Sequence, residues 1–284
     1  MSDAAEKPRP RTVLDKDDVL AGLFATWDSI ETLLSGLTPE QWQAPTALPG
    51  WSVQDVVSHI IGTEMMLGGT PTPDIDISGR DHVHNDIGAL NERWVEHLRG
   101  ESPEAMLANY RDVIGRRKAA LTAMSPEEWN TVTFTPAGPD SYGRFMRVRV
   151  FDCWVHEHDI RDALSAPAPD TSYGGADSRL ALDEMTASMG FVVAKKGGAP
   201  DGSRVELALT GPLARTIRVA IDGRAEVVPD FGGDEPTAVI TLDGRQFVRL
   251  AGGRPMTADA PQGIEYGGDE AVGTRIIENL NYVI

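Results

Sequence analysis

The segment RVFDCWVHEHDIR, residues 149–161, belongs to a helix that the apolar spacing predicts over 142–164. At about 100° per residue, Asp152, His156 and Asp159 fall within one narrow arc of that helix. Apolar residues continue the arc on both sides, so we expect it to face the protein interior. A carboxylate and an imidazole four residues apart can bind one cation, because both lean toward the same helical turn. The first candidate site is therefore a divalent-metal site.

A third ligand is expected from a second helix. His59 lies in the otherwise apolar run VVSHII, and a buried imidazole needs a partner. Helical bundles place metal ligands on facing helices, and two histidines with one carboxylate leave a position open for water or substrate. Spacing alone leaves other interpretations open. Asp152 and His156 could form a hydrogen-bonded pair or a solvated face, and His59 could be a satisfied core residue. Asp159 could be a surface charge or the acceptor for a ligand imidazole.

Residues 15–196 are predicted to form a helical bundle. Apolar stripes with N-cap residues or first-turn prolines indicate helices over 15–37, 52–66, 86–98, 102–124, 142–164 and 178–195. The similar sequences TPEQW and SPEEW follow two of the long helices and suggest two related halves.

The composition changes at the glycine-rich residues 197–203. Beyond them, strands are expected at 205–209, 216–221, 225–228 and 237–242, with helices at 244–251 and 269–279. The predicted fold class is therefore α+β with two domains: an N-terminal four-helix bundle over 15–196 and a smaller α+β domain, a mixed sheet plus helices, over 203–284. Residues 1–14 are expected to form a disordered tail.

The composition argues against nucleic acid as a partner but does not indicate which partner the protein has. The formal charge is −17, from 43 acidic and 26 basic residues, and no basic cluster offsets it, so nucleic acid is not an expected partner. No apolar run reaches the roughly 18 residues of a membrane span, and the N-terminus lacks the apolar segment of a secretory signal. The single cysteine, Cys153, is expected to be a packed thiol and fits a reducing cytoplasm.

Several motifs resemble the mycothiol-dependent maleylpyruvate isomerase family, within the DinB/YfiT-like superfamily. They are LPGWSVQDVVSH at 48–59, HVHNDIG at 82–88 with Asn91 and Glu92, WVHEHDIRDA at 154–163, and FVRLAGGR at 247–254. The resemblance covers nearly the whole chain. It implies a DinB-like four-helix bundle that binds a divalent metal, typically zinc, through His59, Asp152 and His156. The isomerase itself is expected to have glutamate where this chain has the shorter Asp152, which can change the preferred metal.

The resemblance also suggests roles for residues outside the metal site. His82 is a candidate catalytic residue, while Asn85 and Asn91 are candidates for binding the thiol co-substrate. His84 stands where many relatives are expected to have arginine. Arg254 is the candidate for binding an anionic group, because its guanidinium can bind a carboxylate with two hydrogen bonds; the alternative is a surface arginine after a glycine turn.

The function implied by the resemblance is that of a cytoplasmic, mycothiol-dependent metalloenzyme, either monomer or homodimer. A thiol that meets a divalent cation loses its proton near neutral pH, and the thiolate attacks a small electrophile. S-transfer in detoxification is favoured over cis-trans isomerisation of a maleylpyruvate-like acid, because Asp152 replaces the glutamate. Two alternatives remain: a non-catalytic module that binds metal or ligand, and a thiol-independent metal hydrolase.

Overall fold

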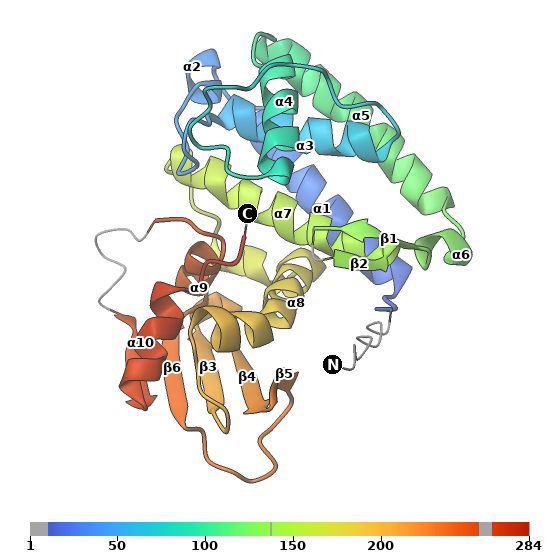
Figure 1. Cartoon of the computed structure of the whole chain (residues 1–284). Helices are drawn as coiled ribbons and strands as arrows, with labels where there is room; N and C mark the ends of the chain where they lie inside the picture. The colour runs from blue at the N-terminus through green and yellow to red at the C-terminus, as the bar shows by residue number, and fades with distance from the viewer. Residues whose placement is uncertain (1–10, 137, 256–262, 284) are drawn as a thin grey trace.

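The structure, a computed structural model, describes residues 11–136, 138–255 and 263–283. Residues 1–10 of the expected tail lie outside this described part. Four long helices form the N-terminal bundle (Figure 1): α1 (Lys16–Leu34), α3 (Val53–Leu67), α5 (Pro103–Ala123) and α7 (Tyr142–Ala163). Their apolar stripes enclose one core, which contains Trp27, Ile60, Tyr110 and Val150. The predicted four-helix bundle is confirmed, with helix ends within a few residues of those expected.

Shorter helices complete this part of the fold. Helix α4 (Asp86–Leu98) packs on α3, while α8 (Ala176–Phe191) packs on α7 and α1 and continues into the π-helical turn η2 (Val192–Lys196). The one-turn helices α2 (Pro39–Trp42) and α6 (Pro126–Trp129) correspond to the two similar sequences. In each, a hydroxyl N-cap and the third helical side chain form a capping box, and the final tryptophan is buried. The two similar sequences, TPEQW and SPEEW, therefore fold into the same local structure.

The C-terminal part is a five-stranded mixed sheet with order β5-β4-β3-β6-β7. Its strands are β3 (Arg204–Thr210), β4 (Arg215–Asp222), β5 (Arg224–Val228), β6 (Ala238–Asp243) and β7 (Glu265–Gly268). Strands β3 and β6 pair in parallel, with Leu207 opposite Ile240, and the other neighbours are antiparallel. Every second residue of the central strands is buried on one face of the sheet. This face packs against α8, α9 (Gly244–Ala251) and α10 (Glu270–Glu278). The expected α+β fold class is confirmed.

Two strand regions were missing from the sequence prediction. One is the hairpin of β1 (Val132–Thr135) and β2 (Gly138–Ser141), and the other is β7. Strand β2 has the sequence GPDS and β7 has EYGG, so both contain residues that disfavour strands. Thr12, which belongs to the tail expected over residues 1–14, lies against this hairpin. Its backbone N–H and its hydroxyl both donate to the Asp140 carboxylate at 2.7 Å.

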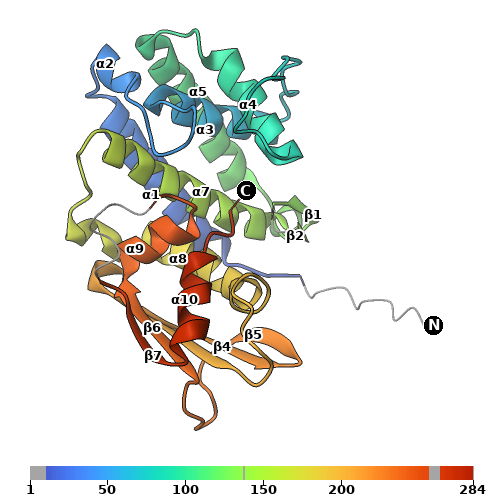
Figure 2. The same cartoon turned by 60° about the vertical axis from the view of Figure 1, so that its left-hand side comes forward.

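Helix α7 runs between the other helices of the bundle and the C-terminal part (Figure 2), and its side chains contribute to both hydrophobic cores. Val150 and Cys153 face the bundle, whereas Phe151, Trp154 and Val155 pack with side chains of the sheet and its helices. Because this packing is continuous, the position of the boundary between the domains stays a prediction. The turns η1 (Asp170–Gly174) and η3 (Gly211–Leu213) connect the remaining elements. In the described ranges, no helix is both long and apolar enough to cross a membrane.

Candidate metal centre

Two facing helices bring His59, Asp152 and His156 together. One ligand atom from each lies within 4.8 Å of the others. His59 Nε2 is 3.2 Å from Asp152 Oδ2, His156 Nε2 is 3.5 Å from Asp152 Oδ1, and the two imidazoles meet edge to face with centroids 5.0 Å apart. The histidine side chains are 5% and 10% exposed, whereas that of Asp152 is 28% exposed. A small molecule can therefore approach the cluster from the carboxylate side.

The Asp152 carboxylate is held in its charged form. Arg149 donates to Asp152 Oδ2 through Nη1 and, at 2.8 Å through Nε, to the fully buried Glu64. Arg117 donates to the other oxygen of Glu64 at 2.8 Å. Burial alone would raise the pKa of Asp152, but Arg149 and the two imidazoles lower it well below its usual range. The Asp152 carboxylate is thus ionised near neutral pH, as a metal ligand would have to be.

His156 is oriented by a second carboxylate. Its Nδ1–H donates to Asp159 Oδ2 at 2.9 Å, which leaves Nε2 directed toward Asp152. Asp159 in turn accepts from Nε of Arg254 at 2.9 Å and from its Nη2. Burial opposes ionisation, but Arg254 and His156 hold the pKa of Asp159 below its usual range. Of the two interpretations left open for Asp159, the structure supports the acceptor of a ligand imidazole.

The imidazole of His59 is held in its neutral form, which is the form that binds metals. Burial lowers the pKa of His59 despite the nearby Asp152. Within the described part of the chain, its buried Nδ1 has no hydrogen-bond partner. Two imidazoles and one ionised carboxylate form a donor set that fits zinc or a similar divalent ion and leaves room for a further ligand.

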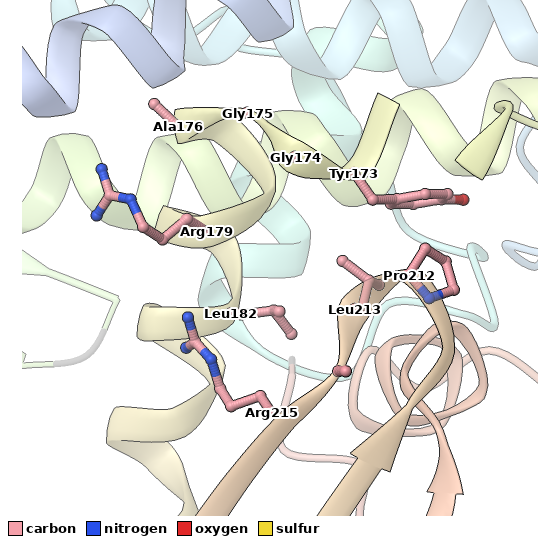
Figure 3. Close-up of a pocket in the computed structure, with 10 residues that line it drawn as sticks. Tyr173, Gly174, Gly175, Ala176, Arg179, Leu182, Pro212, Leu213 and Arg215 are labelled. Carbon is pink, nitrogen blue, oxygen red and sulfur yellow. The ribbon is translucent and has the colours of Figure 1, made fainter. Parts of the chain in front are cut away.

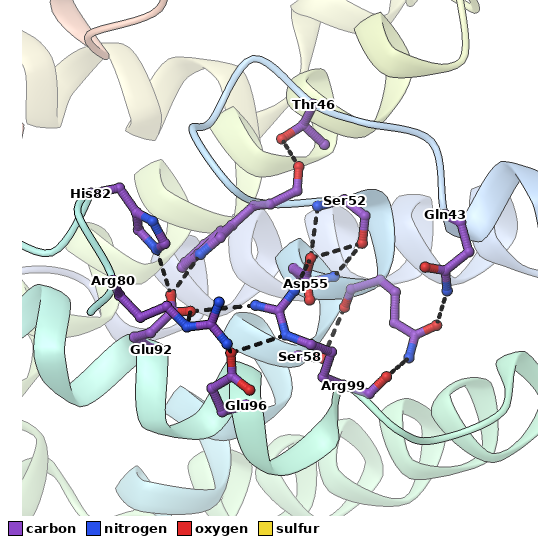
Figure 4. Close-up of polar contacts among 12 residues, drawn as sticks. Gln43, Thr46, Ser52, Asp55, Ser58, Arg80, His82, Glu92, Glu96 and Arg99 are labelled. Carbon is purple, nitrogen blue, oxygen red and sulfur yellow. Dashed lines mark hydrogen bonds and ion pairs between the residues drawn. The ribbon is translucent and has the colours of Figure 1, made fainter. Parts of the chain in front are cut away.

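Trp51, which the sequence reasoning did not single out, forms one side of this site. Its ring centroid lies 5.5 Å from that of His59 and 6.4 Å from that of His156. The indole Nε1–H donates to Glu92 Oε2 at 2.9 Å. His82 Nε2 lies 3.0 Å from the same oxygen, and Figure 4 shows His82 and Glu92 facing each other. In the sequence, Trp51 stands within the family motif LPGWSVQDVVSH, just before the helix that carries His59, but no role was assigned to it.

The other predicted site residues lie outside the cluster of candidate metal ligands. Arg254 is buried and reaches the site through Asp159, so it is not the surface arginine of the alternative interpretation. Asn85 is the exposed N-cap of α4, where its Oδ1 accepts from the N–H of Gly88 at 2.9 Å. Asn91 is partly buried on α4 and His84 is exposed. Binding of a thiol by either asparagine stays a prediction.

Cys153 follows the candidate ligand Asp152 in the chain but does not belong to the cluster. It is fully buried, and Arg149 Nη2 donates to its Sγ at 3.3 Å. Burial raises the pKa of the thiol to about 12. Cys153 is therefore a packed thiol and a poor nucleophile at neutral pH.

Two of the cavities formed by the described residues bear on the search for a site. One, of about 390 Å³, lies along the loop 43–52 and shares Trp51 with the candidate metal centre. The other, of about 290 Å³, lies between the start of α8 and the β3–β4 connection (Figure 3). Its two cationic side chains are already paired, because Arg179 contacts Asp18 and Asp183 while Arg215 binds Asp183 at 2.8 Å.

Comparisons with known proteins cover both parts of the chain. The family model described as mycothiol maleylpyruvate isomerase N-terminal domain matches residues 23–161, and the MDMPI C-terminal domain model matches residues 179–275. Two Mycobacterium tuberculosis proteins, Rv0036c and MT0041, both described as uncharacterized, are each 26% identical over 159 residues. These matches cover 55% of this chain and 60% of each relative, so less than two thirds of the relatives' length is spanned.

Solved structures show the same fold. A crystal structure of the mycothiol-dependent maleylpyruvate isomerase has a TM-score of 0.59 and 18% sequence identity, and covers 89% of this chain and 93% of its own. A mutant form of that enzyme gives the same TM-score and coverage at 17% identity. This likeness supports the two-part architecture described above.

Proposed function

The chain belongs to the mycothiol maleylpyruvate isomerase family in both its N-terminal and its C-terminal part, and from this we propose that it is a metal-dependent enzyme with mycothiol as co-substrate. The observation that carries the proposal is the convergence of His59, Asp152 and His156 in a buried cluster with one partly open side. A divalent cation bound there, with zinc as the expected ion, would supply the positive charge that lowers the pKa of an incoming thiol.

The surrounding residues prepare the ligands for that role. Asp159 fixes the tautomer and direction of His156, while Arg149 fixes the direction of the Asp152 carboxylate. Holding the carboxylate in this way matters because Asp152 has a shorter reach than the glutamate expected in the isomerase. The chain thus orients the three side chains before any ion arrives, although, against the effect of burial, Asp152 and Asp159 raise the pKa of His156, so a bound cation would have to displace a proton there.

The charge balance of the buried cluster favours an anionic ligand. Three arginines are paired with three carboxylates, so these side chains sum to zero: Arg117, Arg149, Arg254, Glu64, Asp152 and Asp159. A divalent cation added to this neutral, poorly solvated shell leaves positive charge uncompensated. A thiolate, or the carboxylate of an acidic substrate, would offset it, which agrees with a thiol co-substrate.

Two reactions begin in the same way on a conjugated acid or another small electrophile. The thiolate sulfur bonds to an electrophilic carbon, and the electron pair of the broken π bond moves toward the carbonyl. In isomerisation, the carbon–carbon bond rotates and elimination returns both the double bond and the thiolate. In S-transfer to a conjugated acid, the adduct takes up a proton and keeps the sulfur; on a chlorinated aromatic, the sulfur instead replaces chloride, which leaves with the electron pair of the C–Cl bond. We propose that this chain catalyses one of these two reactions.

Metal content and thiol dependence test the proposal together. Purified protein should contain about one zinc per chain, and Asp152→Ala and His156→Ala should lose both the metal and the thiol-dependent turnover. Asp162→Ala, which removes an exposed carboxylate from the same helix, is the matched control and should keep both.

Activity is then measured with and without mycothiol, using a maleylpyruvate-like acid and a chlorinated aromatic as electrophiles. Turnover that needs no thiol would identify a metal hydrolase, and bound metal without turnover of either electrophile would favour a binding module. Full activity in a metal-free Asp152→Ala/His156→Ala protein would overturn the proposal.

A further inference from the structure

A buried carboxylate lies beside the candidate metal centre without touching it. The Glu92 side chain, on α4, is 1% exposed and is surrounded by nitrogen donors (Figure 4). Its Oε2 lies 2.9 Å from Trp51 Nε1 and 3.0 Å from His82 Nε2, while its Oε1 lies 3.3 Å from Arg99 Nη2. A buried charge is costly unless it is paired and hydrogen-bonded, and this cluster provides both kinds of partner.

Trp51 connects Glu92 to the metal centre. The indole that donates to Glu92 also packs against His59 and His156, tilted by 37° and 36°. Its position therefore depends on a hydrogen bond from one edge of the ring and on contact of the ring face with two imidazoles.

The turn before Trp51 is fixed by the same cluster. Gly50 has φ of +77°, and a Cβ at this position would lie 3.0 Å from the imidazole of His82. Glycine therefore allows the turn to pack closely on His82. Because His82 and Trp51 share one carboxylate oxygen, the loop that carries His82 and the turn that carries Trp51 are held together.

We infer that Glu92 is a positioning residue that holds the Trp51 indole as the side wall of the metal centre. In this arrangement, His82 helps to hold Glu92 and the turn before Trp51 in place, rather than acting as the catalytic group expected from the sequence. The inference rests on the proposed metal site for its importance. The placement of the indole, however, is a property of the protein without metal and can be tested separately.

The test follows the indole N–H of Trp51 by NMR in ¹⁵N-labelled full-length protein, with the resonance identified by its loss in Trp51→Phe. In Glu92→Leu, hydrogen exchange of this N–H should become at least about tenfold faster, because a hydrogen bond to a charged acceptor is lost. Glu92→Gln, whose amide oxygen can accept one bond, should give an intermediate rate. Should Glu92→Leu fail to fold, Glu92→Gln decides the question.

Glu96→Gln is the matched control. Glu96 lies one turn further along α4 and pairs with Arg80 and Arg99, two of the arginines near Glu92, but it does not contact Trp51. Its variant should keep the exchange rate of the wild-type protein. A purely structural role for Glu92 would instead lower the free energy of unfolding of Glu92→Leu and leave the Trp51 signal unchanged.

Cobalt(II) serves as the probe of distance to the metal centre. In the wild-type protein, bound cobalt should broaden the Trp51 indole signal, and in Glu92→Leu this broadening should weaken while cobalt still binds. A folded Glu92→Leu protein with slow exchange and full broadening would overturn the inference. If cobalt binds to neither protein, the proposed metal function fails, while the exchange rates still decide the role of Glu92.

Discussion

Arg254 forms a buried ion pair with Asp159, and this pair joins the segment just after α9 to the helix that carries two candidate ligands. Because Asp159 also accepts the hydrogen bond from His156 Nδ1, a residue of the C-terminal part lies only one side chain away from the metal centre. The C-terminal part is therefore expected to influence both the stability of α7 and the properties of the site.

Removing the cation of this pair should destabilise the fold. Arg254→Met leaves Asp159 buried and without its partner, at an expected cost of about 3–5 kcal/mol in the free energy of unfolding. Denaturant unfolding measures the change. Arg249→Ala breaks the more exposed pair with Asp162 and should cost at most about 1 kcal/mol. Equal effects from the two substitutions would contradict this account of the buried pair.

Removing the negative charge of Asp159 should weaken metal binding. Asp159→Asn keeps the size of the side chain but removes the charge that supports His156, so zinc affinity should fall by about 10- to 100-fold. Competition with a chelating dye measures the affinity, and Asp162→Asn on the same helix should leave it unchanged. Unchanged affinity in Asp159→Asn would show that the ligand imidazole needs no carboxylate support.

The stability of the protein should depend on pH through His158. This partly buried ring lies between Trp154 and Tyr173, with centroids 4.4 and 5.5 Å away, and burial together with Arg161 lowers its pKa to about 4. The unfolded chain has a histidine pKa near 6.5, so it binds the proton first as the pH falls. Stability should therefore decrease between about pH 6.5 and about pH 4, by up to about 3 kcal/mol.

His158→Phe should make that decrease smaller; the buried His59, whose pKa is also lowered, contributes in the same direction and stays in the variant. Denaturant unfolding of chelator-treated protein across this pH range measures it without a contribution from metal release. Above about pH 7, where the imidazole is neutral in both states, the two proteins should show parallel pH profiles. A variant that still loses as much stability as the wild type would assign the effect to other groups.

Two glycine-to-alanine substitutions should have opposite effects. A Cβ at Gly62 would overlap the Trp94 side chain where α3 packs on α4, so Gly62→Ala should destabilise the protein by about 1–3 kcal/mol. Gly115 is exposed within α5 and a Cβ there meets nothing within 4 Å, so Gly115→Ala should stabilise by about 0.5–1 kcal/mol. Thermal unfolding distinguishes the signs, and a neutral Gly62→Ala would mean that the two helices can separate slightly.

The sequence predicted the features that depend on spacing within one element. Asp152, His156 and Asp159 share a helix, so its periodicity alone places them on one face. The pairing of His59 with them required knowledge of which helices face each other, and the family resemblance supplied it. Helix bounds were predicted closely because caps and prolines mark them.

Interactions between distant segments could not be predicted in this way. Arg254 and Asp159 are 95 residues apart in the chain, and nothing local to either residue indicates the other. Glu92 belongs to a family motif, but its burial could not be predicted, because Trp51, His82 and Arg80 come from other segments and Arg99 lies two turns further along the chain. The β1–β2 hairpin was missed because its second strand has strand-breaking residues, and its pairing partner determines the conformation instead.

The ligands of the candidate metal centre come from parts of the chain that are far apart, since 93 residues separate His59 from Asp152. A cation held by both would act as a reversible cross-link that closes this long loop and binds only the folded chain. Its binding free energy would then add directly to the stability of the bundle. A shortage of the metal would therefore shorten the lifetime of the protein as well as stop its chemistry, so that abundance and activity would follow the same ion.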